Sequence, residues 1–262
     1  MSEKWALVTG ACVNTGAAIV EKFASQGENV VFTGRNAEKV KAAEEIYRKK
    51  YPEVKIVGKV LNALDDSGRV DEIGVERVFN ELDGEGVTVT DLVLNAADLG
   101  VGFNALDSSL DDFIRVINTN LCWNFCIIQY AAKKMKNCGG SITFINSNTA
   151  YRAIPERAAY SASKGGQLGL MRALALDLGK YHIRVNAVLP GMIHTDRTDK
   201  NPEFYKNVPS AFSPLGTIAE GSDIADAVWY FAAHAKNTTG AELAVDCGNM
   251  IQLYPIIPEK RN

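Results

Sequence analysis

Short apolar runs alternate with longer stretches of helical period along the whole chain, and this alternation limits the fold more than any other feature. Seven runs with the residue types of strands span 5–9, 29–33, 54–60, 91–95, 141–147, 183–189 and 242–246. Several of them are apolar at consecutive positions, as at Ala6, Leu7 and Val8. Consecutive apolar residues are typical of strands that are covered on both faces in a parallel sheet.

Helical patterns fill the stretches between these runs, at 16–26, 37–50, 67–82, 109–136, 159–181 and 222–234. Repeated strand–helix–strand units predict an α/β fold, a Rossmann-like, doubly wound parallel sheet of about seven strands with helices on both faces. No composition break or long polar linker divides the chain, so we expect a single domain over residues 1–262. Residues 196–216 are rich in Pro, Asn, Ser and Asp and lack periodicity, and we expect them to form a substrate lid.

Composition and charge argue against several classes of partner. The formal net charge of -3 and the pI near 5.7 provide no basic field that would attract nucleic acid. The five cysteines include no CxxC pair and the three histidines lack ligand spacing, so neither disulfides nor a metal site is expected. The first residues do not resemble a signal peptide, and no run is long enough to span a bilayer. A cytoplasmic protein without a membrane partner is expected.

The first predicted strand leads directly into a turn of small residues that opens a helix. This turn contains Gly10, Asn14, Thr15 and Gly16. Backbone N–H groups at a helix N-terminus attract anions, and small side chains let phosphates approach the backbone, so the turn predicts a binding site for a dinucleotide diphosphate. The alternative is a tight strand-to-helix turn that binds no ligand.

The end of the second predicted strand bears on which nicotinamide cofactor the chain binds. Gly34 stands where an NAD site usually offers a carboxylate to the ribose hydroxyls, and Arg35 follows it. A guanidinium can pair with the 2′-phosphate of NADP(H), which a carboxylate would repel. We therefore expect NADP(H) rather than NAD(H). The alternative is that Arg35 is a solvated loop residue.

A tyrosine and a lysine lie four positions apart in a predicted helix, at Tyr160 and Lys164, so their side chains share one face. A free phenol has a pKa of about 10, and a nearby cation favours the phenolate that general acid–base catalysis near neutral pH requires. Ser147 lies at the end of the fifth predicted strand, where sites form in parallel sheets. Position alone makes Asn120 an ordinary polar helix residue.

Taken together, these residues resemble the short-chain dehydrogenase/reductase family, whose members use an Asn-Ser-Tyr-Lys tetrad. The similar segments, in the family's order, are residues 9–16, 91–97, 118–121, 147, 160–164, 186–195 and 239–248. The resemblance covers almost the whole chain.

The resemblance implies a role for each member of the tetrad. Tyr160 gives or takes the proton at the substrate oxygen, while Ser147 holds that oxygen by a hydrogen bond. Lys164 lowers the pKa of the phenol and binds the nicotinamide ribose. Asn120 fixes a water molecule that links Lys164 to solvent for proton return.

The resemblance also implies cofactor contacts outside the first turn. Asn95 approaches a ribose, and Asn62, the nearest polar candidate after the third strand, reads the adenine. The residues that shape the nicotinamide pocket are Pro190, Gly191, Ile193 and Thr195. Among these, the Ile193 backbone and the Thr195 hydroxyl meet the carboxamide.

Three positions depart from the family's glycines: Asn14 in the first turn, Ala97 after the fourth strand, and Cys247 near the end. Asparagine tolerates a left-handed backbone better than most side chains, so the turn can persist at Asn14. Alternatively, the Asn14 side chain crowds the phosphates and weakens cofactor binding.

The expected function is that of an NADP(H)-dependent oxidoreductase that interconverts a ketone or aldehyde and an alcohol by hydride transfer. The alternative is a non-catalytic NADP(H)-binding sensor or structural subunit. An enoyl reductase is less favoured because such relatives use a longer tyrosine-to-lysine spacing. Steroid, sugar and acyl-chain substrates are all compatible with the sequence. The resemblance also implies a homodimer or homotetramer that packs through the helices at 109–136 and 159–181, unless these helices are buried within one subunit.

Overall fold

The computed structural model describes residues 3–102, 104–200, 202 and 211–253. The predicted lid at 196–216 is described at its two ends only, because 201 and 203–210 lie outside the described residues. At its first end, α7 (Asp196–Asp199) is a single helical turn.

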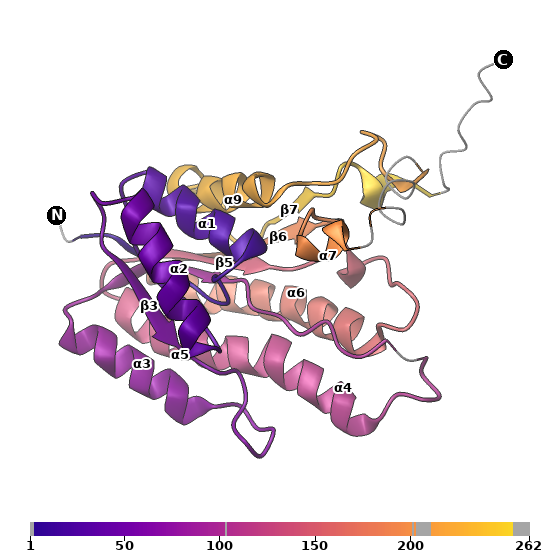
Figure 1. Cartoon of the computed structure of the whole chain (residues 1–262), viewed down its shortest axis with the longest axis horizontal. Helices are drawn as coiled ribbons and strands as arrows, with labels where there is room; N and C mark the ends of the chain where they lie inside the picture. Colours follow the sequence, from indigo (N-terminus) through magenta and orange to yellow (C-terminus); the bar gives the residue numbers. More distant parts are fainter. Residues whose placement is uncertain (1–2, 103, 201, 203–210, 254–262) are drawn as a thin grey trace.

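Seven parallel strands form one sheet, as the apolar runs predicted (Figure 1). They are β1 (Trp5–Val8), β2 (Asn29–Gly34), β3 (Ile56–Val60), β4 (Val89–Leu94), β5 (Gly140–Ile145), β6 (Ile183–Pro190) and β7 (Glu242–Val245). The strand order is β3-β2-β1-β4-β5-β6-β7, so the direction of winding reverses between β1 and β4. In such sheets ligands bind in the crevice at the carboxyl ends of the strands beside this reversal. The predicted fold class is confirmed.

Helices cover both faces of the sheet (Figure 1). They are α1 (Asn14–Ser25), α2 (Ala37–Lys50), α3 (Glu72–Gly84), α4 (Leu110–Ile117), α5 (Trp123–Met135), α6 (Ala158–Gly179) and α9 (Gly221–Trp229). Successive strand side chains point to opposite faces, so Leu7 joins the core beneath α3, α5 and α6, whereas Ala6 and Val8 join the core beneath α1, α2 and α9.

The predicted helix at 109–136 is divided into three parts. A π-helical segment, Asn118–Cys122, separates α4 from α5, and the N–H of Trp123 bonds to the carbonyl of Asn118. The predicted helix at 222–234 likewise ends in a π-helical segment, Tyr230–His234. Such wide turns are frequent at functional sites. The first of them contains Asn120.

The predicted helix at 67–82 begins later than expected, at Glu72. Local side-chain bonds explain the difference, because Asp65 Oδ1 accepts from the N–H groups of Ser67 and Arg69 and holds this stretch in a turn. Asp71 then caps α3 by accepting from the Gly74 N–H at 2.9 Å.

Several apolar residues of α5 and α6 that could mark a subunit contact pack inside this chain. Trp123, Ile127, Leu168 and Met171 are buried in its own core. Within the described part of the chain, no helix has the length and apolar character needed to cross a bilayer. The same residues hold no group of three or more His, Cys, Asp or Glu side chains suited to a metal.

Candidate active site

Three of the four predicted tetrad residues meet beyond the carboxyl end of β5. Ser147 follows that strand, and Tyr160 and Lys164 lie on the first turns of α6. The Ser147 side chain hydrogen-bonds to the Tyr160 side chain, and Lys164 Nζ lies 5.5 Å from the centre of the Tyr160 ring. The four-residue spacing on one helix face therefore brings phenol and ammonium together, as predicted.

Lys164 is almost completely buried, with 1% of its surface exposed. Its ammonium donates to the carbonyl of Ile145 at 2.8 Å and has no carboxylate partner among the described residues. Burial disfavours the charged form and lowers the pKa of Lys164 from 10.5 to about 7. This ammonium is therefore poised to exchange protons near neutral pH.

The Tyr160 phenol is subject to two opposing effects. Burial raises its pKa, and the hydrogen bond with Ser147 lowers it. The Ser147 hydroxyl oxygen itself accepts from the Thr149 hydroxyl at 2.9 Å and the Thr149 N–H at 3.2 Å. These bonds fix the direction of the Ser147 hydroxyl. The expected lowering of the phenol's pKa by Lys164 stays a prediction.

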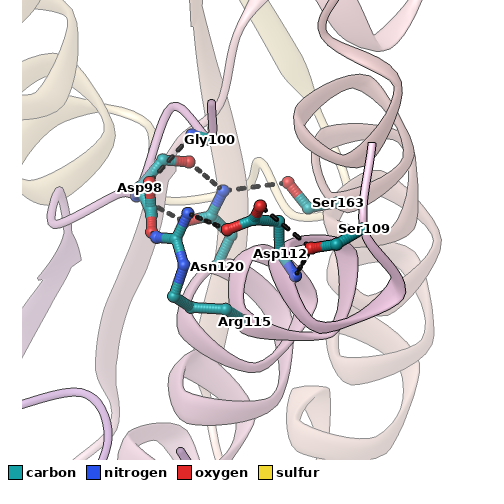
Figure 2. A network of polar contacts seen from close by, with 7 residues as sticks. All are labelled: Asp98, Gly100, Ser109, Asp112, Arg115, Asn120 and Ser163. Carbon is teal, nitrogen blue, oxygen red and sulfur yellow. Dashed lines mark hydrogen bonds and ion pairs between the residues drawn. The ribbon is translucent and has the colours of Figure 1, made fainter. Parts of the chain in front are cut away.

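The Asn120 side chain joins the loop after β4 to α6 (Figure 2). Its Oδ1 accepts from the Asp98 N–H at 2.7 Å, and its Nδ2 donates to the Asp98 carbonyl at 2.8 Å and to Ser163 Oγ at 3.0 Å. Ser163 donates in turn to the Tyr160 carbonyl at 2.7 Å. Asn120 is thus connected to the turn that carries the tyrosine. Its predicted role in fixing a water molecule stays a prediction.

The sequence analysis missed the residues that surround Asn120. The Asp98 carboxylate accepts from the Gly100 N–H at 2.8 Å and pairs with Arg115, which also contacts Asp112 at 3.3 Å (Figure 2). Ser109 caps α4, the helix that carries Asp112 and Arg115, by accepting from the Asp112 N–H at 3.0 Å. A charged residue four positions after the end of a buried strand was the available signal. Asp98 and Arg115 lie 17 positions apart, so no local spacing reveals their pairing.

Two buried amides were missed as well. Asn146 directly precedes Ser147, and Gln167 follows Lys164 by three positions on α6. Both are at least 97% buried. The available signals were the position of Asn146 directly after the buried end of β5 and the helical spacing that places Gln167 on the same face as Lys164.

The predicted diphosphate turn is closely packed. A Cβ on Gly16 would lie 2.5 Å from the carbonyl oxygen of Gly10, and one on Gly10, whose φ is +65°, would lie 2.8 Å from the Ala96 Cβ. Asn95 Nδ2 donates to the carbonyls of Thr9 at 3.0 Å and Gly10 at 2.9 Å. Asn95 therefore holds the turn itself; its approach to a ribose stays a prediction.

The helix that follows this turn has an open N-terminus. No side chain caps α1 at Val13, and its first turn, which includes Thr15, has no acidic residue. Asn14 adopts the left-handed conformation, with φ of 54°. Its Oδ1 accepts weakly from the N–H of Asp196, at 3.3 Å, and so reaches the start of the predicted lid. Cys247, at another family glycine position, is also left-handed, with φ of 55°.

The preference for NADP(H) over NAD(H) was predicted from Gly34 and Arg35 at the end of β2, and it stays a prediction. Arg35 is exposed and forms no ion pair with a described residue. A Cβ on Gly34 would lie 2.5 Å from Cys12 Sγ, so local packing favours glycine where an NAD site has a carboxylate. Asn62 is exposed beyond the end of β3.

The predicted nicotinamide residues follow β6. Pro190 is the last residue of that strand, and a Cβ on Gly191 would lie 2.8 Å from the Asp246 Cβ. Ile193 forms an isolated parallel bridge with Ala219. The Thr195 N–H donates to Thr198 Oγ1 at 2.9 Å, which shapes the entry to α7.

A small cleft of about 30 Å³ lies beside Tyr160. It is lined by Leu99, Gly100, Val101, Ser108, Asp112, Phe113, Val116 and residues 156–160. A larger hollow of about 540 Å³ involves Trp5 and Ile56, at the amino ends of the strands, away from the tetrad. The cleft at Tyr160 lies near the carboxyl ends of the strands, where sites form in parallel sheets.

Comparisons with known proteins agree with this fold. Residues 10–249 match the family model described as enoyl-(acyl carrier protein) reductase. The chain is 34% identical over 248 residues to a 3alpha-hydroxysteroid dehydrogenase of Mediterraneibacter gnavus, covering 94% of this chain and 96% of the relative. It is 32% identical over 256 residues to an NADP-dependent (R)-specific alcohol dehydrogenase of Lentilactobacillus kefiri, covering 95% and 97%.

A solved short-chain dehydrogenase/reductase from Serratia marcescens superimposes with a TM-score of 0.84 at 29% identity, covering 94% of this chain and 98% of that one. The family model and both relatives match nearly the whole chain. The chain therefore belongs to the short-chain dehydrogenase/reductase family of oxidoreductases.

Proposed function

We propose that the protein is an NADP(H)-dependent oxidoreductase that interconverts a ketone or aldehyde and an alcohol, with Tyr160 as its acid/base. One observation carries the proposal: Ser147, Tyr160 and a buried lysine that has no carboxylate partner among the described residues lie together, and Tyr160 lines a small cleft. A purely structural site would have no need for an unpaired buried ammonium, because burying a charge is costly.

In this proposal each polar group acts at the substrate oxygen or on its neighbour. Tyr160 donates the proton to the oxygen in reduction and removes it in oxidation. Ser147 binds the same oxygen. Because the Ser147 hydroxyl oxygen accepts from Thr149, the Ser147 hydroxyl proton can point the other way and be donated. Lys164 stabilises the Tyr160 phenolate by its charge. With a pKa of about 7, it also returns a proton to Tyr160 after reduction.

The residues at the carboxyl ends of β1 and β2 fit a phosphorylated dinucleotide. The uncapped start of α1, free of acidic side chains, suits a diphosphate, and Gly10 and Gly16 hold the turn close to it. Arg35 is free to pair with a 2′-phosphate, and the NADP dependence of one relative, the (R)-specific alcohol dehydrogenase, supports this choice over NAD(H). When bound, the cofactor supplies or accepts the hydride. Asn62, Asn95, Pro190, Gly191, Ile193 and Thr195 complete the proposed contacts.

The segment at 196–216 is proposed to close over the substrate. The contact between Asn14 and Asp196 supports this role, since it joins the start of the segment to the cofactor turn. A homodimer or homotetramer is also proposed. Phe125 on α5 and Leu176 on α6 support assembly, because they are 41% and 84% exposed.

The decisive experiment measures cofactor binding and turnover in the same preparation. Fluorescence titration should show tighter binding of NADPH than of NADH, and a panel of ketones and aldehydes should include at least one substrate. Tyr160→Phe should lower kcat by at least about 100-fold and leave NADPH binding intact. Tyr181→Phe, a half-exposed tyrosine just after α6, is the matched control and should keep full turnover.

Three results would contradict the proposal. Turnover by Tyr160→Phe within threefold of the wild type excludes the phenol as acid/base. Tight NADPH binding without turnover of any substrate favours the sensor alternative. The panel includes an enoyl thioester, because the description of the matched family model names an enoyl reductase. Exclusive reduction of its carbon–carbon double bond would replace the proposed carbonyl chemistry.

A further inference from the structure

Four buried side-chain amides belong to one hydrogen-bonded group that reaches from Lys164 to the π-helical turn. Asn120, Asn124, Asn146 and Gln167 have exposed fractions of 0%, 0%, 3% and 1%. Burying an amide costs free energy unless it is hydrogen-bonded, so such a concentration beside a buried ammonium requires a specific reason. The bonds of Asn146 and Gln167 supply one.

The Asn146 side chain bonds to the backbone of two tetrad residues. Its Oδ1 accepts from the N–H of Ser147 at 2.7 Å, and its Nδ2 donates to the carbonyl of Lys164 at 2.9 Å. The preceding carbonyl, that of Ile145, accepts from Lys164 Nζ at 2.8 Å. Lys164 is therefore held to the end of β5 at both its backbone and its ammonium group.

The Gln167 side chain connects Asn146 to the π-helical turn. Its Oε1 accepts from Asn146 Nδ2 at 3.0 Å, and its Nε2 donates to the Asn120 carbonyl at 2.6 Å. The same carbonyl accepts from Asn124 Nδ2 at 2.8 Å. Gln167 thus connects the end of β5 to the π-helical segment between α4 and α5. It does not line the cleft beside Tyr160, and its side-chain bonds go to Asn146 and Asn120 rather than to the phenol.

We propose that Asn146 and Gln167 form a carboxamide pair that positions Ser147 and Lys164 for proton transfer, with Gln167 as a positioning residue for the chemical step. The inference rests on the proposed function. Volume alone does not require an amide at position 167, since leucine fills a similar space. What leucine lacks is the acceptor for Asn146 and the donor for Asn120.

The first test is Gln167→Leu, assayed for kcat, KM and NADPH affinity. Because a small misplacement of reacting groups is costly, kcat should fall by about 10- to 100-fold, while KM and the NADPH Kd stay within twofold. Asn186→Leu is the matched control. Asn186 is also fully buried and makes two bonds at 3.0 Å, with the Thr238 carbonyl and the Ala241 N–H, away from the tetrad. It should lose stability but keep kcat.

A second readout follows Lys164 directly and does not depend on turnover. In protein labelled with ¹³C at the lysine ε-carbon, NMR titration should give a higher midpoint for Lys164 in Gln167→Leu than in the wild type, because a loosened ammonium becomes better hydrated. Asn146→Ser should cause the same change, and it replaces Gln167→Leu if that variant fails to fold. The double variant should have a kcat no lower than the worse single variant, since the pair acts as a unit.

The outcomes separate this inference from the proposed function. Normal kcat and an unmoved Lys164 titration in the variants overturn the positioning role and leave the proposed function standing. A loss of kcat in Asn186→Leu as large as in Gln167→Leu also overturns it, because it would reflect stability alone. If the wild type has no turnover, the proposed function fails, and the Lys164 titration alone decides whether the pair positions the lysine.

Discussion

Replacing Lys164 with methionine should stabilise the protein at pH 6 while removing turnover. The Lys164 ammonium is 1% exposed, and the Ile145 carbonyl is its hydrogen-bond partner. Methionine has a similar length and no charge, so Lys164→Met removes the buried cation with little change in packing. The prediction connects the chemistry of the site to a stability measurement that needs no substrate.

The magnitude follows from the pKa of Lys164, which burial lowers from 10.5 to about 7. At about 1.36 kcal/mol per pKa unit, this difference corresponds to about 5 kcal/mol of lost stability at pH values below 7, where the lysine is charged in both states. The variant leaves the Ile145 carbonyl without its donor, and this offsets about 1–3 kcal/mol of the stability gained. Lys164→Met should therefore gain about 2–4 kcal/mol at pH 6, or roughly 5–15 °C in Tm.

The sign of the pH dependence is specific. The folded protein gives up the lysine proton near pH 7 and the unfolded chain near 10.5, so wild-type stability recovers as the pH rises between these values. Urea denaturation at pH 6, 8 and 10 should show the advantage of Lys164→Met shrinking steadily. Lys134→Met, at an exposed lysine paired with Asp83, is the control and should show no such trend. A stability difference that does not change with pH would refute the reasoning.

Two further predictions concern Asp91 on β4 and Gly16 in the turn before α1. Burial raises the pKa of the Asp91 carboxyl to about 7, so its contribution to stability is present below pH 4 and is lost as the pH rises through 7; Asp91→Asn should exceed the wild type by about 2–4 kcal/mol at pH 8.5 and match it at pH 4 in urea denaturation. An equal difference at both values contradicts this. Gly16→Ala should raise the NADPH Kd at least about tenfold in fluorescence titration, because its Cβ would lie 2.5 Å from the Gly10 carbonyl. Gly84→Ala, with no atom within 4 Å of the new Cβ, should bind normally, and unchanged binding by Gly16→Ala would refute the packing argument.

The sheet was predictable because its signal is local. Runs such as Leu92, Val93 and Leu94 are apolar at consecutive positions, and strands buried on both faces require that pattern. Tyr160 and Lys164 were predictable for a similar reason, since helical geometry alone places residues four apart on one face.

The interruptions of the helices were not predictable from periodicity. Apolar residues lie before, within and after the π-helical turn, as at Ile117, Leu121 and Trp123, so the pattern at 109–136 does not reveal the interruption. The late start of α3 depends on the Asp65 and Asp71 carboxylates, which accept hydrogen bonds from nearby N–H groups. Composition does not decide whether such a stretch forms a turn or a helix.

The sequence by itself determined the order of strands and helices along the chain, the turn of small residues after β1 and the proximity of Tyr160 to Lys164, because each depends on residues close in the chain. Tertiary structure decided which buried polar groups meet. Asn120 bonds to Asp98 across 22 positions and accepts from Gln167 across 47. A hydrogen bond leaves no periodic trace in the sequence. Burial of Lys164, and with it the pKa near 7, likewise arises only when α6 packs against the end of β5.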